Sequence, residues 1–209
     1  MRNTILLAFF ICIFQITYAQ SYFEGKVVYA NTFKSKVPNV TGEQMGKMIG
    51  TRQEYYIKDG NYKTLTNGLS VSGQLYDNKL NRLYNKTPMS DTLYWFDPSM
   101  DGSPAVSFEI IKNKKNILGN MCDALIVKSA KSVTTYYYSA KYKLNASLYT
   151  KHHYGGWYYF LSKSGALPLM TVVDNNQFTM VSVAVGIESM RLKAEDFLVK
   201  PGTPVKRSK

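Results

Sequence analysis

Three side chains in this sequence could take part in catalysis or metal binding: Cys122, His152 and His153. A cysteine thiolate activated by a histidine is a nucleophile, and the same residue types bind zinc. The two histidines are adjacent, so their side chains point to opposite faces of a strand or diverge by about 100° on a helix. Both histidines therefore cannot easily bind one metal, and no third ligand is evident beside them. The plainer interpretation is a pair of part-exposed histidines near a strand end.

The segment around Cys122 predicts a buried and unreactive thiol. Cys122, Ala124 and Ile126 share one face of an alternating run that is typical of a strand. The G-x-S-x-G, H-E-x-x-H and glycine-rich nucleotide-binding motifs are absent, and the acidic residues are few and scattered. We therefore predict a non-enzymatic protein with no metal and no cofactor. A hydrolase that uses Cys122 with His152 or His153 is the weakest of three hypotheses.

Residues 1–19 are typical of a secretory signal peptide. They contain one basic residue, Arg2, an apolar run over 5–14, and a small residue, Ala19, at the exit. A membrane anchor needs about 20 apolar residues, and Gln15 and Thr17 end the run too early. We predict cleavage after Ala19 and export to a periplasm or cell envelope. One cysteine, Cys122, then remains, so the domain has no internal disulfide, which suits a bacterial envelope.

The chain is basic, with 26 Lys and Arg against 14 Asp and Glu and a formal net charge of +12. Outside the cytoplasm such a protein meets anionic lipid head groups or polysaccharide rather than nucleic acid. We expect contact with an anionic membrane surface and no nucleic-acid partner. The lysines are dispersed, however, which favours a generally solvated basic surface. We predict one domain over residues 20–199 and a basic tail over residues 200–209 that leaves it as extended chain.

Short runs rich in Tyr, Val, Ile and Phe, separated by turn residues, dominate the remaining sequence. Asp59-Gly60 predicts a hairpin between two such runs, and the lysine-rich residues 112–116 predict a basic turn. About ten runs follow one another at close spacing. This pattern indicates a mainly β domain built on a meandering antiparallel sheet, either curled or closed.

Two stretches favour helix. In residues 41–50, Thr41 and Gln44 form a capping box, and Met45, Met48 and Ile49 form an apolar stripe at helical spacing.

The second stretch covers residues 156–165. Trp157, Phe160 and Leu161 share a face there, and Gly165 is a typical helix end, although a strand also fits. A chain reversal at residues 155–156 separates this stretch from the histidines. Residues 151–160 are therefore best interpreted as framework at the rim of the sheet.

Aromatic residues are abundant, with 17 Tyr, 10 Phe and 2 Trp. Aromatics combined with basic charge are also found where proteins stack on single-stranded nucleic acid. Here most of them alternate within strands, as a packed core requires. Together with methionines they could also line an adaptable apolar cavity. The sequence alone does not separate a filled barrel from one with a cavity.

Three segments carry a resemblance to a known group of proteins: "NILGNMCDALIVKSAKSVTTYYYS", "GGWYYFLSKSGALPLMTVV" and the tail "EDFLVKPGTPVK". They resemble exported Bacteroidetes domains near the GLPGLI-type proteins, whose proposed relatives are the lipoprotein carriers LolA and LppX. The resemblance implies an unclosed antiparallel β half-barrel with one to three short helices in its concave face, where the carriers take up acyl chains. The matching positions look structural; they are Ile117, Leu118, Gly119, Cys122, Gly165, Pro168 and Leu169.

Our first hypothesis is a binding protein that holds a lipid, an acyl chain or another apolar ligand in the half-barrel. The predicted cavity residues are Met45, Met48, Ile49, Tyr55, Ile57, Trp95, Phe108, Trp157 and Phe160. The alternative is an envelope structural or interaction protein with a filled core and no ligand. A deep cavity in the structure would favour the first hypothesis, and a solid core would favour the second.

Overall fold

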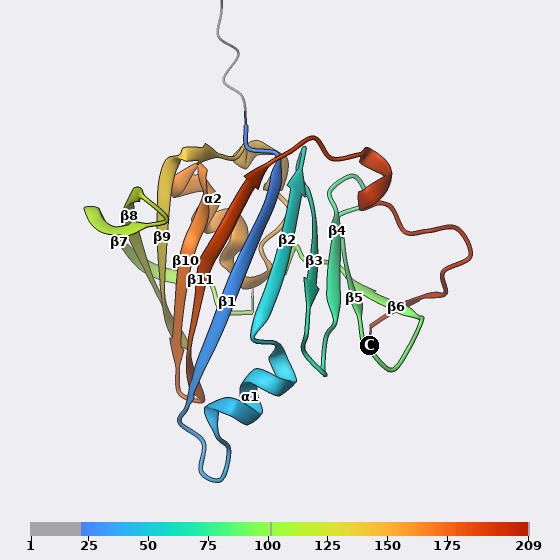
Figure 1. The fold of residues 1–209 in the computed structure, drawn as a ribbon, viewed down its shortest axis with the longest axis horizontal. Helices are drawn as coiled ribbons and strands as arrows, with labels where there is room; N and C mark the ends of the chain where they lie inside the picture. Colours follow the sequence, from blue (N-terminus) through green and yellow to red (C-terminus); the bar gives the residue numbers. More distant parts are fainter. Residues whose placement is uncertain (1–21, 101, 209) are drawn as a thin grey trace, which may run out of the picture.

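The computed structural model describes residues 22–100 and 102–208, so the predicted signal peptide lies outside the described residues. Its main feature is one twelve-stranded sheet in the order β12-β6-β5-β4-β3-β2-β1-β11-β10-β9-β8-β7, not closed into a barrel (Figure 1). The strands are β1 (Gly25–Ser35), β2 (Arg52–Lys58), β3 (Asn61–Thr66), β4 (Gly73–Asp77), β5 (Arg82–Lys86), β6 (Leu93–Phe96), β7 (Ala105–Ile117), β8 (Asn120–Ser129), β9 (Ser132–Lys143), β10 (Ala166–Asn175), β11 (Phe178–Ser189) and β12 (Val205–Arg207). The predicted mainly β, curved and unclosed sheet is confirmed.

The sheet consists of two antiparallel meanders, β1–β6 and β7–β11, joined where β1 pairs with β11. Local turns fix each meander. At the predicted hairpin between β2 and β3, Asp59 and Gly60 both adopt positive φ (45° and 81°), as a tight two-residue turn requires. The junction is long-range, since Val27 of β1 lies between Tyr55 of β2 and Ile187 of β11.

The tail corrects one prediction, because it does not leave the domain. Val205–Arg207 forms β12, which pairs in parallel with β6, in contrast to the antiparallel pairing of the other strands. Backbone hydrogen bonds extend this pairing at both ends, from Leu93 N to Pro204 O (2.9 Å) and from Ser208 N to Trp95 O (2.8 Å). The pairing uses the unpaired backbone groups of an edge strand, which side-chain composition does not reveal.

The lysine-rich residues 112–116 are a second correction, because they are not a turn. They belong to strand β7, and a bulge there shifts the register of its pairing with β8. Asn113 adopts positive φ (52°), and its backbone N–H donates to the Asp123 carboxylate (3.0 Å). The chain instead reverses at Leu118 and Gly119, which both have positive φ. A bulge with charged side chains also protects an exposed sheet edge against pairing with other strands.

The helices are α1 (Gly42–Ile49), α2 (Trp157–Ser164) and the short 3-10 helices η1 (Ala146–Tyr149), η2 (Tyr154–Gly156) and η3 (Ala194–Phe197). The sheet curls around α2 (Figure 1), so we call the face that holds α2 the concave face and the opposite one the convex face. Gly156 before α2 and Gly165 after it are left-handed, as the predicted reversal and helix end require. Among the described residues, no helix is long and apolar enough to cross a bilayer.

Helix α1 forms as predicted but packs through a different side. Thr41 and Gln44 make the reciprocal hydrogen bonds of a capping box. The buried residue of α1 is Gly46, however, where a Cβ atom would lie 2.9 Å from Thr51 Cγ2 and 3.7 Å from the Phe33 ring of β1. The helix backbone approaches β1 closely at Gly42, where a Cβ atom would clash with the Phe33 carbonyl oxygen, and Met48 and Ile49 of the predicted apolar stripe are exposed.

Removing the Thr41 hydroxyl should weaken α1. We expect Thr41→Ala to lower the free energy of unfolding by about 1 kcal/mol, because the Gln44 N–H loses its acceptor. Thr41→Ser keeps the capping oxygen and should stay close to the parent protein. Urea unfolding followed by circular dichroism measures both variants, and equal losses in the two would contradict a capping role.

Candidate functional site

Stacked aromatic side chains occupy the concave face. Tyr55, Tyr62 and Tyr76 form a row across β2, β3 and β4, with ring centroids 5.2 and 5.3 Å apart. Tyr149 of η1 continues the row from Tyr76 at 6.2 Å. From the opposite meander, Tyr136 of β9 stacks on the fully buried Phe160 of α2 at 4.3 Å. Segment 146–164 thus joins the two meanders through ring contacts.

Four of the nine predicted cavity residues come together in this aromatic core. Tyr55 contacts Trp157, which contacts Phe160, and Ile57 is buried in the same cluster. Since these side chains pack against one another, they act as core in the described structure.

The other five predicted cavity residues lie elsewhere. Met48 and Ile49 of α1 are 49% and 41% exposed, and Met45 is half-buried. Phe108 is also exposed, on the edge strand β7, where its ring contacts Tyr159 at 6.2 Å. Trp95 lies on the convex face, in the same cross-strand row as Tyr84. The structure therefore brings four of the nine residues together and places the other five apart from them.

His152 corrects another prediction, because it is 2% exposed rather than part-exposed. Its Nε2 is hydrogen-bonded to the Tyr62 hydroxyl at 2.8 Å, and its ring lies 4.4 Å from the Tyr76 ring. Burial lowers the pKa of His152 from 6.5 to about 4, so the ring is neutral at neutral pH. His153 is half-buried and contacts Tyr158, so the adjacent histidines diverge as expected.

The predicted burial of Cys122 is confirmed, since the thiol is fully buried on β8. Burial, and secondly the neighbouring Asp123 charge, raise the pKa of the Cys122 thiol above its ordinary value. A protonated and inaccessible thiol is a poor nucleophile. Within residues 22–100 and 102–208, no group of three His, Cys, Asp or Glu side chains is placed to hold a metal ion.

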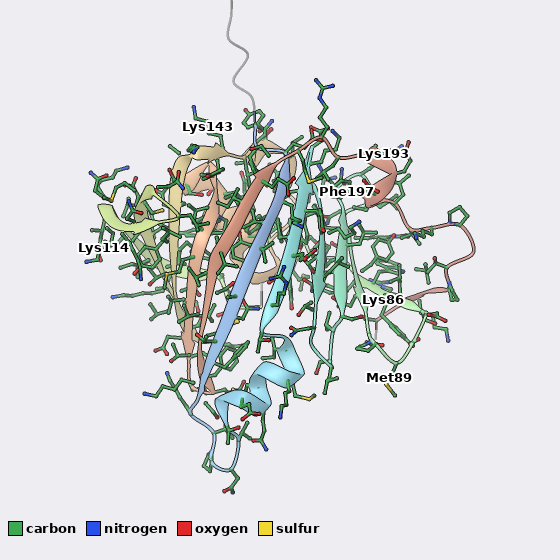
Figure 2. All side chains as sticks on the ribbon, in the orientation of Figure 1. Lys86, Met89, Lys114, Lys143, Lys193 and Phe197 are labelled. Atoms are coloured by element: carbon green, nitrogen blue, oxygen red, sulfur yellow. The ribbon has the colours of Figure 1, made fainter. Side chains whose placement is uncertain are left out.

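The C-terminal segment, residues 194–208, crosses the convex face of β3–β6, and we call it the strap. Phe197 of η3 is buried at one end of the strap, and β12 pairs with β6 at the other. Between these anchors the chain stands away from the sheet (Figure 1), and Phe197 and Lys86 are labelled in Figure 2. The strap and the sheet enclose an open groove of about 870 Å³, which we call the strap groove.

The floor of the strap groove is largely apolar, although Lys63 and Lys86 also lie on it. Its floor residues are Leu65, Leu75, Tyr84 and Leu93, one from each of β3, β4, β5 and β6. Opposite them, the strap contributes Leu198, Val199, Pro201 and Pro204. The charged lining residues are balanced, with lysines 63, 86 and 200 against Asp91, Glu195 and Asp196. An apolar floor with a mixed charged rim can bind an apolar ligand and leave its polar end at the rim.

Sequence reasoning missed this groove, although a signal was present. A sheet face exposed to water normally carries polar residues at alternate positions. Leu65, Leu75, Tyr84 and Leu93 occupy the outward-facing positions of four successive strands, opposite to the buried row of Tyr62 and Tyr76. Lys63 and Lys86 share this outward face, but its four apolar residues are more than a sheet face open to water requires, and they indicate that the outward face is partly covered.

Trp95 extends the convex row beyond Tyr84, and two arginine side chains lie over its ring. The Cζ atoms of Arg82 on β5 and Arg207 on β12 lie 4.0 and 5.3 Å from the Trp95 ring. Guanidinium groups stack favourably on an indole ring, and the stacking restrains their orientation. This Arg82–Trp95–Arg207 stack adjoins the strap groove through Tyr84.

Fold and site define a mainly β protein with an unclosed twelve-stranded sheet, a helix on its concave face and a C-terminal strap on its convex face. No family model matches the chain, and no curated protein matches it. Among solved structures, that of PNGF-II in a C2 space group is similar, with a TM-score of 0.48 and 10% identity. The similar region covers 89% of this chain and 31% of that chain, and a likeness this weak carries no functional argument. The resemblance to lipoprotein carriers stays a prediction.

Proposed function

We propose that this chain is an exported, non-enzymatic protein that binds an apolar ligand, such as a lipid acyl chain, in the strap groove. The observation that carries the proposal is the groove of about 870 Å³ with its apolar floor. Small-molecule sites are typically concave, mostly apolar and about 300–1,000 Å³ in volume. Export rests on the signal-peptide pattern of residues 1–19.

The proposal moves the ligand from the concave to the convex face. On the concave face, the Trp157 ring already packs against the rings of Tyr55 and Phe160, so the side chains fill this space themselves. On the convex face, Leu65 is 47% exposed and Leu198 of the strap is 58% exposed. A ligand between them would remove apolar surface from water, which stabilises a complex by about 25 cal/mol per Å².

Buried candidate nucleophiles and bases support a binding role over catalysis. Cys122 and His152 are each enclosed by the core, and neither lines the strap groove. The groove contains three lysines and three carboxylates at its rim but no histidine or cysteine. Hydrolysis by a nucleophile and a base would need such a pair within hydrogen-bond reach.

A second candidate function is an envelope structural or interaction protein that binds no small ligand. The packed aromatic core and the outward-facing Met48 and Ile49 of α1 favour this candidate. Its partner surface would be the exposed side of α1 rather than the strap groove.

Octan-1-ol tests the proposed function. We expect isothermal titration calorimetry to show its binding to the mature protein, and Leu65→Gln to weaken that binding about tenfold, because a polar amide replaces apolar floor. Leu80→Gln is the matched control, since Leu80 is comparably exposed but lies in the β4–β5 turn. Absence of binding, together with a ligand-free native mass of protein purified from its own envelope, would favour the second candidate. Equal effects of the two variants would place the ligand elsewhere.

A further inference from the structure

We propose that the Arg82–Trp95–Arg207 stack binds the phosphate head group of a ligand whose apolar chain lies in the strap groove. The inference rests on the proposed function for the chain and adds the chemical class of the ligand, an alkyl phosphate such as a phospholipid head with its acyl chain. The stack is a separate feature of the convex face, and its binding of phosphate can be measured with a ligand that has no alkyl chain.

The two guanidinium groups are held in place but leave their donors available. Both stack on Trp95, with Arg82 half-buried and Arg207 exposed. Within the described part of the chain, no carboxylate forms an ion pair with either arginine, although ion pairs of other residues do occur on this surface. Arginine N–H groups form a rigid fork that matches phosphate oxygens, so stacked and unpaired arginines are suited to bind one.

Two carboxylates close to these arginines in the fold, Asp77 and Asp97, accept hydrogen bonds from other donors. Asp77 lies opposite Arg82 in the strand pairing, and its Oδ1 accepts the Leu80 N–H at 3.0 Å. Asp97 accepts from Ser99 N and Asn81 Nδ2, each at 2.9 Å. The Ser99 hydrogen bonds, and more weakly the Arg207 charge, lower the pKa of Asp97. Asp97 therefore attracts Arg207 without pairing with it.

The stack lies where the head of a groove-bound chain would emerge. Trp95 pairs directly with Tyr84, and Leu93 precedes it by two residues on the same face of β6. Tyr84 and Leu93 are both part of the groove floor. An acyl chain on that floor therefore places its first polar group beside the guanidinium groups. Two cations on one indole repel each other, and a phosphate carrying up to two negative charges relieves this repulsion better than a neutral head.

The two arginines come from different elements, which gives the site a second consequence. Arg82 belongs to the sheet, whereas Arg207 belongs to the strap strand β12. A phosphate that contacts both would tie β12 to β5 and hold the strap over its ligand. We therefore expect backbone amide hydrogen exchange of residues 205–208 to slow when the head group binds.

The experiment compares octyl phosphate, octan-1-ol and inorganic phosphate by titration calorimetry on the mature protein. We expect octyl phosphate to bind at least tenfold more tightly than octan-1-ol. Arg82→Gln should reduce this preference while octan-1-ol affinity stays unchanged, and the Arg82→Gln/Arg207→Gln double variant should remove the preference. Arg191→Gln removes the same charge at an exposed position outside the groove and should have no such effect. Because Arg207→Gln could also undock the strap, Arg82→Gln is the decisive variant.

Each other result overturns the inference in a recognisable way. Equal affinities for octyl phosphate and octan-1-ol would contradict the head-group site but would still agree with ligand binding in the strap groove. If inorganic phosphate binds as tightly as octyl phosphate, the site binds free phosphate, and the octyl chain contributes nothing to the affinity. Failure of all three probes to bind would overturn both the inference and the proposed function. A preference for octyl phosphate that survives in Arg82→Gln would place the phosphate elsewhere.

Discussion

The free energy of unfolding should fall by about 2 kcal/mol between pH 7.5 and pH 5, and by about 3 kcal/mol in total by pH 4, because of His152 alone. Burial lowers the pKa of folded His152 to about 4, whereas the unfolded ring titrates near 6.5. The unfolded state therefore takes up the proton first as the pH falls. The contribution is fully present above pH 6.5 and is lost progressively as the pH falls toward 4.

Among the described residues, the side chains that contact the His152 ring carry no charge that could compensate a protonated imidazole. Tyr62 of β3 binds Nε2 through its hydroxyl, and Tyr76 of β4 contacts the ring edge to face. Tyr149 of η1 lies beside Tyr76, and burial raises the pKa of its hydroxyl above the ordinary value. These neighbours are neutral across the range, so a protonated His152 would be a buried unpaired cation.

Urea unfolding at pH 7.5 and pH 5 measures this effect. His152→Gln keeps a hydrogen-bonding group near the Nε2 position and should be less stable than the parent at pH 7.5, but its stability should change little down to pH 5. His153→Gln is the matched control and should keep the pH dependence of the parent. The carboxylates with lowered pKa, Glu24 among them, act mainly below this window. An unchanged pH dependence in His152→Gln would contradict a neutral buried ring.

The parts of the fold that could be predicted are those that local sequence encodes. Alternating apolar residues predicted the strands of both meanders. Asp59-Gly60 predicted the hairpin between β2 and β3, because few residue types tolerate the positive φ that its turn requires. The capping box at Thr41 and the left-handed glycines around α2 act within one helical turn. Each of these signals depends on neighbours a few residues apart.

The parts that could not be predicted depend on contacts between distant residues. Tyr62 and His152 are 90 positions apart, and neither residue indicates the other. The aromatic run after the histidines favoured the helix α2, with a strand as the open alternative, and did not indicate which strands it would contact. The candidate site was missed for the same reason. Its roof is the strap, held by backbone pairing of Val205–Arg207 with β6, and parallel pairing of three residues has no side-chain signature.

Position also decides what an apolar residue does. Met45, Met48 and Ile49 have helical spacing, yet α1 approaches β1 through Gly42 and buries Gly46, so Met48 and Ile49 are exposed. Strand β6 has apolar residues on both faces, so its sequence does not show which face is concave. Trp95 lies on the convex face. Periodicity therefore identifies which residues share a face, whereas long-range packing determines which face is covered.

Phe160→Ala should lower the free energy of unfolding by about 4 kcal/mol, a large fraction of the stability of an average domain. Phe160 is fully buried, and its ring contacts Tyr136 and Tyr138 of β9 and Trp157 of its own helix. Removing the ring leaves a cavity between α2 and β9, where rigid strands limit collapse. Because segment 146–164 joins the two meanders, the loss should appear as one cooperative change in global unfolding.

Two variants separate this packing effect from a loss of helix structure. Tyr159→Ala changes a residue of the same helix and raises helix propensity as much as Phe160→Ala does. Tyr159 is half-buried near the edge strand β7, so the free energy of unfolding should fall by at most about half as much. Phe160→Leu keeps much of the buried volume and should be intermediate. Thermal and urea unfolding of all three rank the losses. A Tyr159→Ala loss equal to that of Phe160→Ala would mean that α2 stabilises the sheet as a helix, without a specific contribution from the ring that connects it to β9.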